Sequence, residues 1–323
     1  MKKIAPPKKT PPLALKQAPS GTASQRLLWS GWTDRGHVRA NNEDSFLGLQ
    51  FDGREVRHLG RLGEASLANQ DFAFAVSDGM GGAAAGEFAS RIAVEKITQL
   101  LPRSFQQTAA GMTAGFSDVL SELFTQINRA LTFLGSCYEE CRGMGATLSL
   151  CWFTPGWMYF GHIGDSRIYY LSARDGSIKQ LTQDDTHVGW LQRMGQINER
   201  EARTHPRRHL LQKALGAGSQ FVDPQVGAVG CEPGDIFLLC TDGLTDGLYD
   251  QQLLELLRSP EAAAGDGNAA QQLVNASLAN SGRDNTTALV VQIGGAAESS
   301  AQKKQRQKNG GRKIGTGKAG TEK

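Results

Sequence analysis

Short apolar runs, each bounded by glycine, proline or polar residues, recur along the chain and predict β-strands. One of the clearest is Phe-Ala-Phe-Ala-Val at 72–76. Thr154-Pro-Gly-Trp157 separates two further runs and has the composition of a hairpin turn. The predicted strands cover residues 28–33, 45–50, 71–77, two segments within 145–171, 226–229, 236–241 and 287–293.

Apolar residues spaced three and four apart predict two long helices. In the helix predicted at 86–101, the residues expected on the buried face are Phe88, Ile92, Ala93, Ile97 and Leu100. In the helix predicted at 112–134, they are Phe116, Leu120, Leu123, Ile127, Leu131 and Leu134. Shorter helices are expected near 249–258 and 268–280.

Two segments break the strand pattern. Residues 52–69 have the composition of an irregular insertion, and residues 182–220 are polar, with short helical pieces around 184–194 and 198–204. A connection as long as the second is usually functional in a compact domain. Hairpin-linked strands with helices grouped between them predict an α+β fold, in which helices cover antiparallel sheets.

The charge of the chain is distributed unevenly over its 323 residues. Residues 1–26 carry six Lys or Arg and no acid, and residues 301–323 carry eight Lys or Arg and one Glu. We therefore expect a folded domain at 27–297 between disordered basic tails at 1–26 and 298–323. The tails either keep the protein in solution or attach it to nucleic acid or an anionic membrane surface.

The cysteines and the apolar runs indicate where the protein works. Five cysteines, an odd number, occur without a signal peptide, which argues against a secreted disulfide framework. No apolar stretch in the sequence is long enough to span a bilayer. We expect a cytoplasmic protein.

Three carboxylates stand where predicted strands begin or end. Asp78 and Asp242 each follow an apolar run and precede a glycine, and Asp284 comes just before the strand at 287–293. A strand end positions such a side chain rigidly, and the glycine lets the chain turn away. Carboxylate oxygens are the ligands that Mg²⁺ and Mn²⁺ prefer, so a divalent-metal centre is predicted.

A polar loop, Arg39-Ala-Asn-Asn-Glu43-Asp44, adds two acids and a guanidinium to this set. A cluster of acids can hold two divalent ions if one carboxylate bridges them, and such a pair activates a water for in-line attack. The planar guanidinium of Arg39 suits a phosphoryl group, since it can bind two phosphate oxygens at once. The residues therefore predict two-metal hydrolysis of a phosphoester.

Seven ordered motifs resemble those of the bacterial metal-dependent serine/threonine protein phosphatases of the PPM family. They are TDRGHVRANNEDS (33–45), SDGMGGAAAGEFAS (77–90), GMGATL (143–148), GHIGDSRIYYL (161–171), LLQKALG (210–216), CTDGLTDGL (240–248) and RDNTTALVV (283–291). The resemblance spans roughly residues 28–293 and implies a four-layer α-β-β-α sandwich. In that fold, two antiparallel sheets are covered by helices.

The resemblance also implies roles at two metal ions, Mn²⁺ or Mg²⁺. Asp78 would bridge the ions, with the Gly79 carbonyl as a further ligand. Asp242 and Asp284 would complete one ion and Glu43 the other. Arg39, Asp78 and Asp242 are the residues expected to carry the catalysis.

The resemblance also implies roles for residues around these ligands. Asp44 belongs to the metal-binding set and would stand behind the ligands, while Asn285 would orient Asp284. Asp165 matches the acid that helps to hold a third ion in bacterial members. Residues 182–209 match the flap, a segment that lies beside the active site in the family.

One position departs from many eukaryotic members of the family. Met80 stands where they carry a histidine that is thought to protonate the leaving alkoxide. The proton must come from a metal-bound water or from another group. His162, His187 and His205 are candidates in matching motifs, although a structural or surface role also fits each of them.

The resulting hypothesis is a phosphatase that removes phosphate from Ser and Thr of proteins through a metal-activated water, opposing a bacterial Ser/Thr kinase. One alternative is an inactive relative that binds phosphoproteins and regulates a partner. Another is a metal-dependent phosphatase of small phosphoesters. The retained metal-binding acids argue against the first alternative, and the long flap argues against the second.

Deleting residues 1–26 and 301–323 together is expected to leave hydrolysis of a small aryl phosphate unchanged, because all seven motifs lie between them. The measurement compares kcat/KM of the full and shortened chains with the same metal ion. A loss of more than about ten-fold would place the tails in the catalytic unit.

Overall fold

The computed structural model describes residues 25–52, 54–81, 85–109, 115–218, 221–259 and 268–295, with side chains omitted at 103–109. The predicted C-terminal tail and residues 1–24 of the predicted N-terminal tail lie outside these described residues. Arg26, which we had assigned to the tail, instead begins the first strand. To preserve this strand, an N-terminal deletion should remove no more than residues 1–24.

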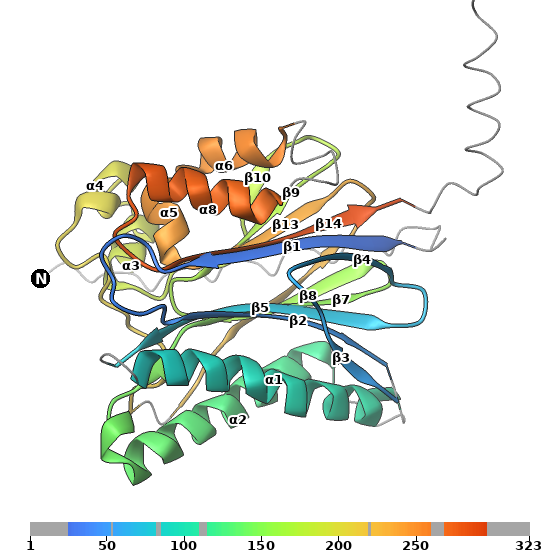
Figure 1. Ribbon diagram of the computed structural model, residues 1–323, viewed down its shortest axis with the longest axis horizontal. Helices are drawn as coiled ribbons and strands as arrows, with labels where there is room; N and C mark the ends of the chain where they lie inside the picture. The colour runs from blue at the N-terminus through green and yellow to red at the C-terminus, as the bar shows by residue number, and fades with distance from the viewer. Residues whose placement is uncertain are drawn as a thin grey trace, which may run out of the picture.

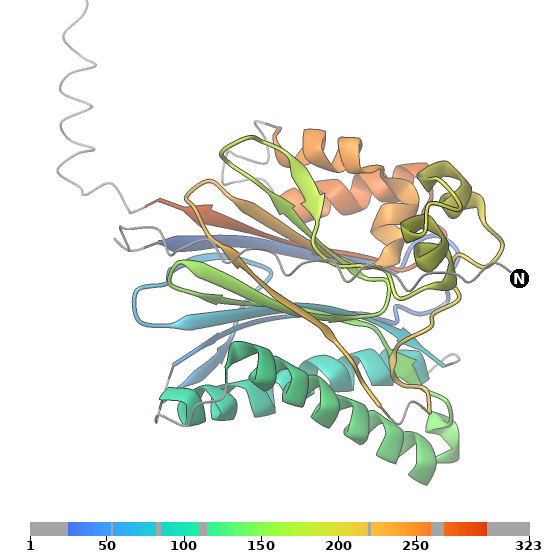
Figure 2. The ribbon, with the colours of Figure 1, turned by 180° about the vertical axis from the view of Figure 1, so that it is seen from behind.

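Four layers are stacked in the order helix, sheet, sheet, helix (Figures 1 and 2). This arrangement confirms the predicted α-β-β-α sandwich. In the described part of the chain, every pair of neighbouring strands is antiparallel. The sheet drawn in the upper half of Figure 1 is called sheet 1 here, and the other is called sheet 2.

Within the described residues, sheet 1 has the strand order β10-β9-β13-β14-β1-β4. Its strands in this order are Ile178–Gln180, Arg167–Leu171, Ile236–Cys240, Thr286–Gly294, Arg26–Asp34 and Leu62–Ser66. Sheet 2 has the order β11-β6-β5-β7-β8-β12, with β2 paired to β5 and β3 paired to β2. These strands are Leu215–Gly216, Gly145–Ala146, Asp71–Met80, Leu148–Thr154, Trp157–Ile163, Gln225–Gly230, Asp44–Phe51 and Val56–His58.

The alternating side chains of β5 show how the sheets pack. Phe72 and Phe74 point into the core between the sheets, whereas Ala73 and Ala75 point into the core beneath the helices. Trp29 of β1 lies 6.2 and 5.9 Å from the two phenylalanine rings, measured between ring centroids. Large residues therefore fill the space between the sheets, and small ones let the helices approach closely.

Helices cover the outer face of each sheet. Under sheet 2 lie α1 (Ala85–Ala109) and α2 (Phe116–Cys137), followed by the 3₁₀ turn η1 (Glu139–Cys141). Over sheet 1 lie α5 (Asp242–Gly247), α6 (Asp250–Leu257) and α8 (Ala269–Asn280). Beside α5 are α3 (His187–Arg193) and α4 (Glu199–Thr204), which form the predicted flap (Figure 1).

The predicted buried face is confirmed for α2 and partly wrong for α1. In α2, the residues buried against sheet 2 include Leu120, Leu123, Ile127 and Leu131. In α1, Phe88 is 42% exposed, and Ala89 is buried in its place. The start of α1 lies against β5, and so close an approach leaves room for alanine at the contact.

Beyond the short strands β10 and β11, which were not predicted, two longer segments differ from the sequence-based predictions. Residues 52–69, expected to be irregular, contain the short strands β3 and β4, each of which pairs with the edge of a different sheet. Residues 242–247 form α5, which we did not predict. Neither segment has a periodic pattern long enough to identify it, because pairing and packing with distant elements hold both in place. None of the helices among the described residues has both the length and the apolar character needed to cross a membrane.

The buried carboxyl of Asp71 at the start of β5 generates a prediction about stability. It accepts a 2.8 Å hydrogen bond from the Trp152 indole, and burial raises its pKa to about 6. Because the folded state holds this proton more tightly than the unfolded state, the stabilisation is complete below about pH 4 and is lost as pH rises to about 6.

Asp71→Asn is therefore expected to raise the free energy of unfolding at pH 7 by about 3 kcal/mol, because the amide oxygen still accepts from Trp152. The gain should shrink at pH 4.5. Urea titrations at the two pH values measure it, with Asp52→Asn in an exposed turn as the control. An equal effect of Asp71→Asn at both pH values would contradict this account.

Candidate metal centre

The acids predicted from strand ends meet at one end of the sandwich. Asp44 begins β2 and Asp78 lies near the end of β5, and the two are paired directly across these strands. Thr241 follows β13 and precedes Asp242, the first residue of α5. Asp284 precedes β14, which pairs with β13. The structure thus brings together acids from both sheets.

Asp44 joins the two sheets at this end. Its Oδ2 accepts 2.7 Å hydrogen bonds from the hydroxyls of Thr241 and Thr287, which belong to the sheet 1 side. The Thr241 hydroxyl also accepts a bond from the Thr287 backbone N–H. The buried carboxylate therefore has a fixed orientation, and it lies behind the other acids, as the resemblance implied.

Mutual repulsion among the acids is strong. Burial raises the pKa of Asp78 well above its usual value, and the charges of Asp44, Asp242, Asp165 and Asp284 raise it further. Burial likewise raises the pKa of Asp44 to about 7, although its two threonine bonds oppose the shift. Such a group of acids is unfavourable without compensating positive charge.

The loop that carries Arg39 and Glu43 is held by Asn285. The Asn285 side chain accepts from the Glu43 backbone N–H at 2.8 Å and donates to the carbonyls of Arg35 and Asn41 at 2.9 Å. Its contact with Asp284 comes from the backbone, since the Asn285 N–H donates to Asp284 Oδ1 at 2.8 Å. The side chain that we expected to orient Asp284 instead positions the loop.

Arg39 stands at the rim of the acid cluster. Its side chain is half exposed, and Nη2 lies 2.6 Å from Asp284 Oδ2. The hydrogen bond to Asp284 raises the pKa of Arg39, and the charges of Glu43 and Asp78 add to the shift. The guanidinium is thus kept at the edge of the cluster, within reach of solvent.

Two glycines permit close packing of Gly79 and Glu43 against the start of α1. A Cβ on Gly79 would lie 1.9 Å from the Gly86 carbonyl oxygen, and a Cβ on Gly86 would lie 2.9 Å from Glu43 Cδ. The Gly79 N–H also donates to the Glu43 carbonyl at 3.2 Å. Any larger residue at either position would push the start of α1 away from Gly79 and Glu43.

Asp165 joins the cluster from the turn after β8. Burial raises its pKa well above the usual value, with the nearby charge of Asp242 as the next cause. Thr147 links this turn to β5, since its hydroxyl accepts from the Asp78 N–H at 2.9 Å and lies 2.7 Å from the Ser166 hydroxyl. Asp165 and Asp78 are therefore held in a common frame.

The three histidine candidates lie away from the acids. His162 is fully buried, with its ring nitrogens bonded to Ser149 Oγ and the Gly164 carbonyl, and burial lowers its pKa to about 4. His187 stacks on Trp190, and His205 accepts from a backbone N–H at the end of α4. The contacts of each of the three are thus with groups outside the acid cluster.

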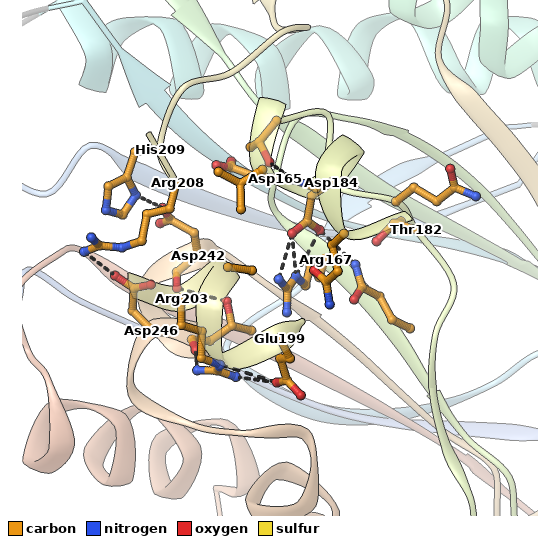
Figure 3. A pocket seen from close by; sticks show the side chains of 18 of the residues that line it. Asp165, Arg167, Thr182, Asp184, Glu199, Arg203, Arg208, His209, Asp242 and Asp246 are labelled. Carbon is orange, nitrogen blue, oxygen red and sulfur yellow. Dashed lines mark hydrogen bonds and ion pairs between the residues drawn. The ribbon is translucent and has the colours of Figure 1, made fainter. Parts of the chain in front are cut away.

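His209 is the histidine that the structure places at the cluster. Its Nδ1 lies 3.3 Å from Asp242 Oδ2, and that contact raises its pKa. Figure 3 shows it at the edge of a cavity of about 320 Å³ between the flap and α5. Asp165 and Asp242 line the same cavity, so the cavity opens directly beside the acids.

The residues present fit divalent cations. The buried Oδ1 atoms of Asp44 and Asp242 have no hydrogen-bond partner among the described residues. The acids supply hard oxygen donors, and their repulsion would be relieved by positive charge. Among the described residues, Asp284 Oδ2 pairs with Arg39 and Asp242 Oδ2 with His209, so a bound cation would compete with these two partners for the carboxylates.

Comparison with known proteins agrees with this geometry. The sequence model described as protein phosphatase 2C matches residues 61–279. The chain belongs to the protein phosphatase 2C family. This confirms the resemblance to bacterial PPM phosphatases that the seven motifs indicated.

Individual relatives extend the comparison. The serine/threonine protein phosphatase PstP of Mycobacterium tuberculosis is 35% identical over 270 residues, which cover 83% of this chain and 45% of PstP. This chain thus spans about half the length of that relative. The serine/threonine phosphatase Stp of Listeria monocytogenes is 32% identical over 262 residues, covering 80% of this chain and 93% of Stp. A crystal structure of the PstP catalytic domain in complex with two manganese ions matches with a TM-score of 0.64 and 32% identity. It covers 84% of this chain and 100% of that chain.

Sequence reasoning missed the residues that support the acids. Thr241, Thr287 and Thr147 lie inside the quoted motifs, yet nothing local marks their hydroxyls as partners of Asp44 and Asp78. His209 directly precedes the motif LLQKALG, in a segment without periodicity. The one signal in the sequence was its place at the end of the segment predicted as the flap; its contact with Asp242 is visible only in the structure.

Removing metal ions is expected to destabilise this protein, because the acids then repel one another without compensation. A free Mn²⁺ concentration about 100 times Kd stabilises by about 2.7 kcal/mol, which corresponds to a Tm rise of roughly 5–10 °C in a domain of this size. Thermal melts with chelator, Mn²⁺ and Mg²⁺ measure the shift.

Asp78→Asn should abolish the metal-dependent shift and raise Tm in chelator, since it removes one of the repelling charges. Asp52→Asn, in the turn after the opposite end of β2, serves as the matched control and should behave like the unmodified protein. A Tm that neither ion raises would show that the acid cluster does not bind them.

Proposed function

We propose that this protein is a serine/threonine protein phosphatase that hydrolyses phosphoserine and phosphothreonine in proteins. The observation that carries the proposal is the cluster of Asp44, Asp78, Asp165, Asp242 and Asp284 with Arg39 at its rim. Acids that repel one another suit divalent ions, and an arginine beside them suits phosphate. The names of PstP and Stp support the same substrate class.

Within this proposal, the acids have separate tasks at two Mn²⁺ or Mg²⁺ ions. Asp78 would be shared between the ions and the Gly79 carbonyl would add a ligand, while Asp242 and Asp284 would hold one ion and Glu43 the other. Bound ions supply an activated water and neutralise phosphoryl charge. The manganese ions in the PstP structure support this assignment.

Asp44 and Asp165 complete the proposed metal set. Asp44, fixed by two threonine hydroxyls, stands behind the ligands and keeps their spacing. Asp165, which lines the cavity together with Asp242, would help to hold a third ion. Glu43 stays in place because Asn285 holds its loop.

Arg39 binds the substrate phosphate. Its guanidinium is half exposed and paired with Asp284, and an ion bound to Asp284 would free the guanidinium for the phosphate oxygens. His209 stands at the edge of the same space, 3.3 Å from Asp242. Its imidazole would donate a proton to the leaving oxygen, a task that Met80 cannot perform.

The proposed setting is the cytoplasm, where the enzyme opposes a bacterial Ser/Thr kinase. We place the catalytic domain at residues 26–297, one residue longer than predicted, so that it includes all of β1. Contact of the basic tails with nucleic acid or an anionic surface remains a prediction. The inactive-regulator alternative and the small-phosphoester alternative are separated from the proposal by one assay.

That assay measures phosphate release from a phosphothreonine peptide with Mn²⁺, with Mg²⁺ and with chelator. Release should require a metal ion. Asp242→Asn should reduce kcat by at least about 100-fold, since it removes a charged group that acts on the reacting centre. Arg39→Ala should raise KM and lower kcat, and Asp52→Asn should change neither.

Each alternative gives a different result. A folded protein that binds the phosphopeptide without releasing phosphate under any metal ion would favour the regulator. Metal-dependent hydrolysis of an aryl phosphate with no action on the peptide would favour a small-phosphoester phosphatase.

A further inference from the structure

The short helix α5 is held by side chains that bind its backbone carbonyls. From α8, Ser277 donates to the Gly243 carbonyl at 2.9 Å, and Asn280 donates to the Gly247 carbonyl at 2.9 Å. These bonds satisfy acceptors that a helix of six residues leaves open at its end. They also fix α5, and with it Asp242, to the body of the fold.

Arg203 of the flap binds the carbonyls on another side of α5. Its guanidinium donates to the Thr245 carbonyl at 2.5 Å and to the Leu248 carbonyl at 3.1 Å. It stacks over the Tyr249 ring, 3.8 Å from the centroid, and pairs with Glu199 at 3.2 Å on its own helix. Its side chain is only 19% exposed. Each group around this guanidinium is therefore an acceptor or a ring face that suits it.

The remaining contacts of the flap with α5 are weaker or belong to the metal centre. Arg208 lies 3.7 Å from Asp246, and His209 contacts Asp242. Figure 3 shows Arg203, Glu199 and Asp246 along one side of the cavity that Asp165 and Asp242 also line. Among the polar contacts that the described flap residues make with α5 and Leu248, those of Arg203 are the shortest, so we expect the position of α4 beside this cavity to depend on Arg203.

We propose that Arg203 is a positioning residue that holds the flap helix α4 on α5 and thereby shapes the cavity for the polypeptide around the phosphorylated residue. This inference rests on the proposed protein substrate. The phosphate itself would be bound by Arg39 and the metal centre, outside the reach of Arg203. Loss of Arg203 is therefore expected to change KM for a phosphorylated peptide and to leave the hydrolysis of a small phosphoester unchanged.

The guanidinium is required for this contact. Its planar fork reaches two carbonyls at once while one face lies on Tyr249. A lysine ammonium can bind one carbonyl but cannot make the same paired and stacked contact. Arg203→Lys should therefore restore only part of the effect of losing the side chain.

Steady-state kinetics with two substrates test the proposal. Arg203→Ala should raise KM for a phosphothreonine peptide roughly ten-fold, as expected for the loss of charged hydrogen bonds. The kcat/KM for p-nitrophenyl phosphate and the Mn²⁺ concentration for half-maximal activity should stay within about two-fold. Arg200→Ala, which removes an exposed arginine from the same helix, is the matched control and should leave all three values unchanged.

Limited digestion with chymotrypsin gives a readout independent of activity. Trp190 is 40% exposed in α3 and Leu210 is 55% exposed after α4. Cleavage at these positions should be several-fold faster in Arg203→Ala than in Arg200→Ala, because the flap is released from α5. Tyr249→Leu should show an intermediate rate, because it removes the stacking contact alone.

If Arg203→Ala lowers kcat/KM equally for the peptide and for p-nitrophenyl phosphate, or changes the Mn²⁺ dependence, then Arg203 acts through Asp242. Either result would overturn the proposal. An unchanged cleavage rate would overturn it as well. If the unmodified enzyme hydrolyses p-nitrophenyl phosphate and not the peptide, the proposed protein substrate is wrong, while the cleavage rates still decide whether Arg203 holds the flap.

Discussion

The buried carboxylate of Asp44, bonded to Thr241 and Thr287, is the interaction on which the metal centre depends. These two 2.7 Å bonds cross from sheet 2 to sheet 1 at the end where Asp78, Asp242 and Asp284 meet. Apolar packing between the sheets is non-directional and would tolerate small sliding motions. The bonds to Asp44 are directional, so they set the spacing between acids that different sheets carry.

The same end of the sandwich concentrates negative charge that the fold alone does not neutralise. The pKa of Asp78 and that of Asp165 are both raised by burial and by neighbouring acids. This repulsion lowers the free energy of unfolding of the metal-free protein, and bound cations would raise it again. Arg39 and His209 supply partial compensation at the rim, and both contact acids that are proposed metal ligands.

Helix α5 connects this centre to the flap. Its first residue is Asp242, and its carbonyls are bound by Ser277 and Asn280 of α8 on one side and by Arg203 on the other. The cavity beside the metal centre thus has one wall in the rigid fold and one in the flap.

The sequence by itself determined the longer strands, the buried face of α2, the order of the motifs and the acids of the site. Each of these has a local signal, either a period of burial or an acid next to a strand end. Only the tertiary structure decided that β3 and β4 pair with different sheets, that α5 forms, and that Asn285 holds the Glu43 loop. It also placed His209, and none of the three histidines proposed from the sequence, in contact with Asp242. It brought Thr287 to Asp44, 243 residues away in sequence. A local pattern of apolar and polar residues shows which face of a helix or strand is buried. The contacts of α5, Asn285, His209 and Thr287 depend instead on how elements far apart in the sequence pack together, and a short stretch of sequence does not contain that information.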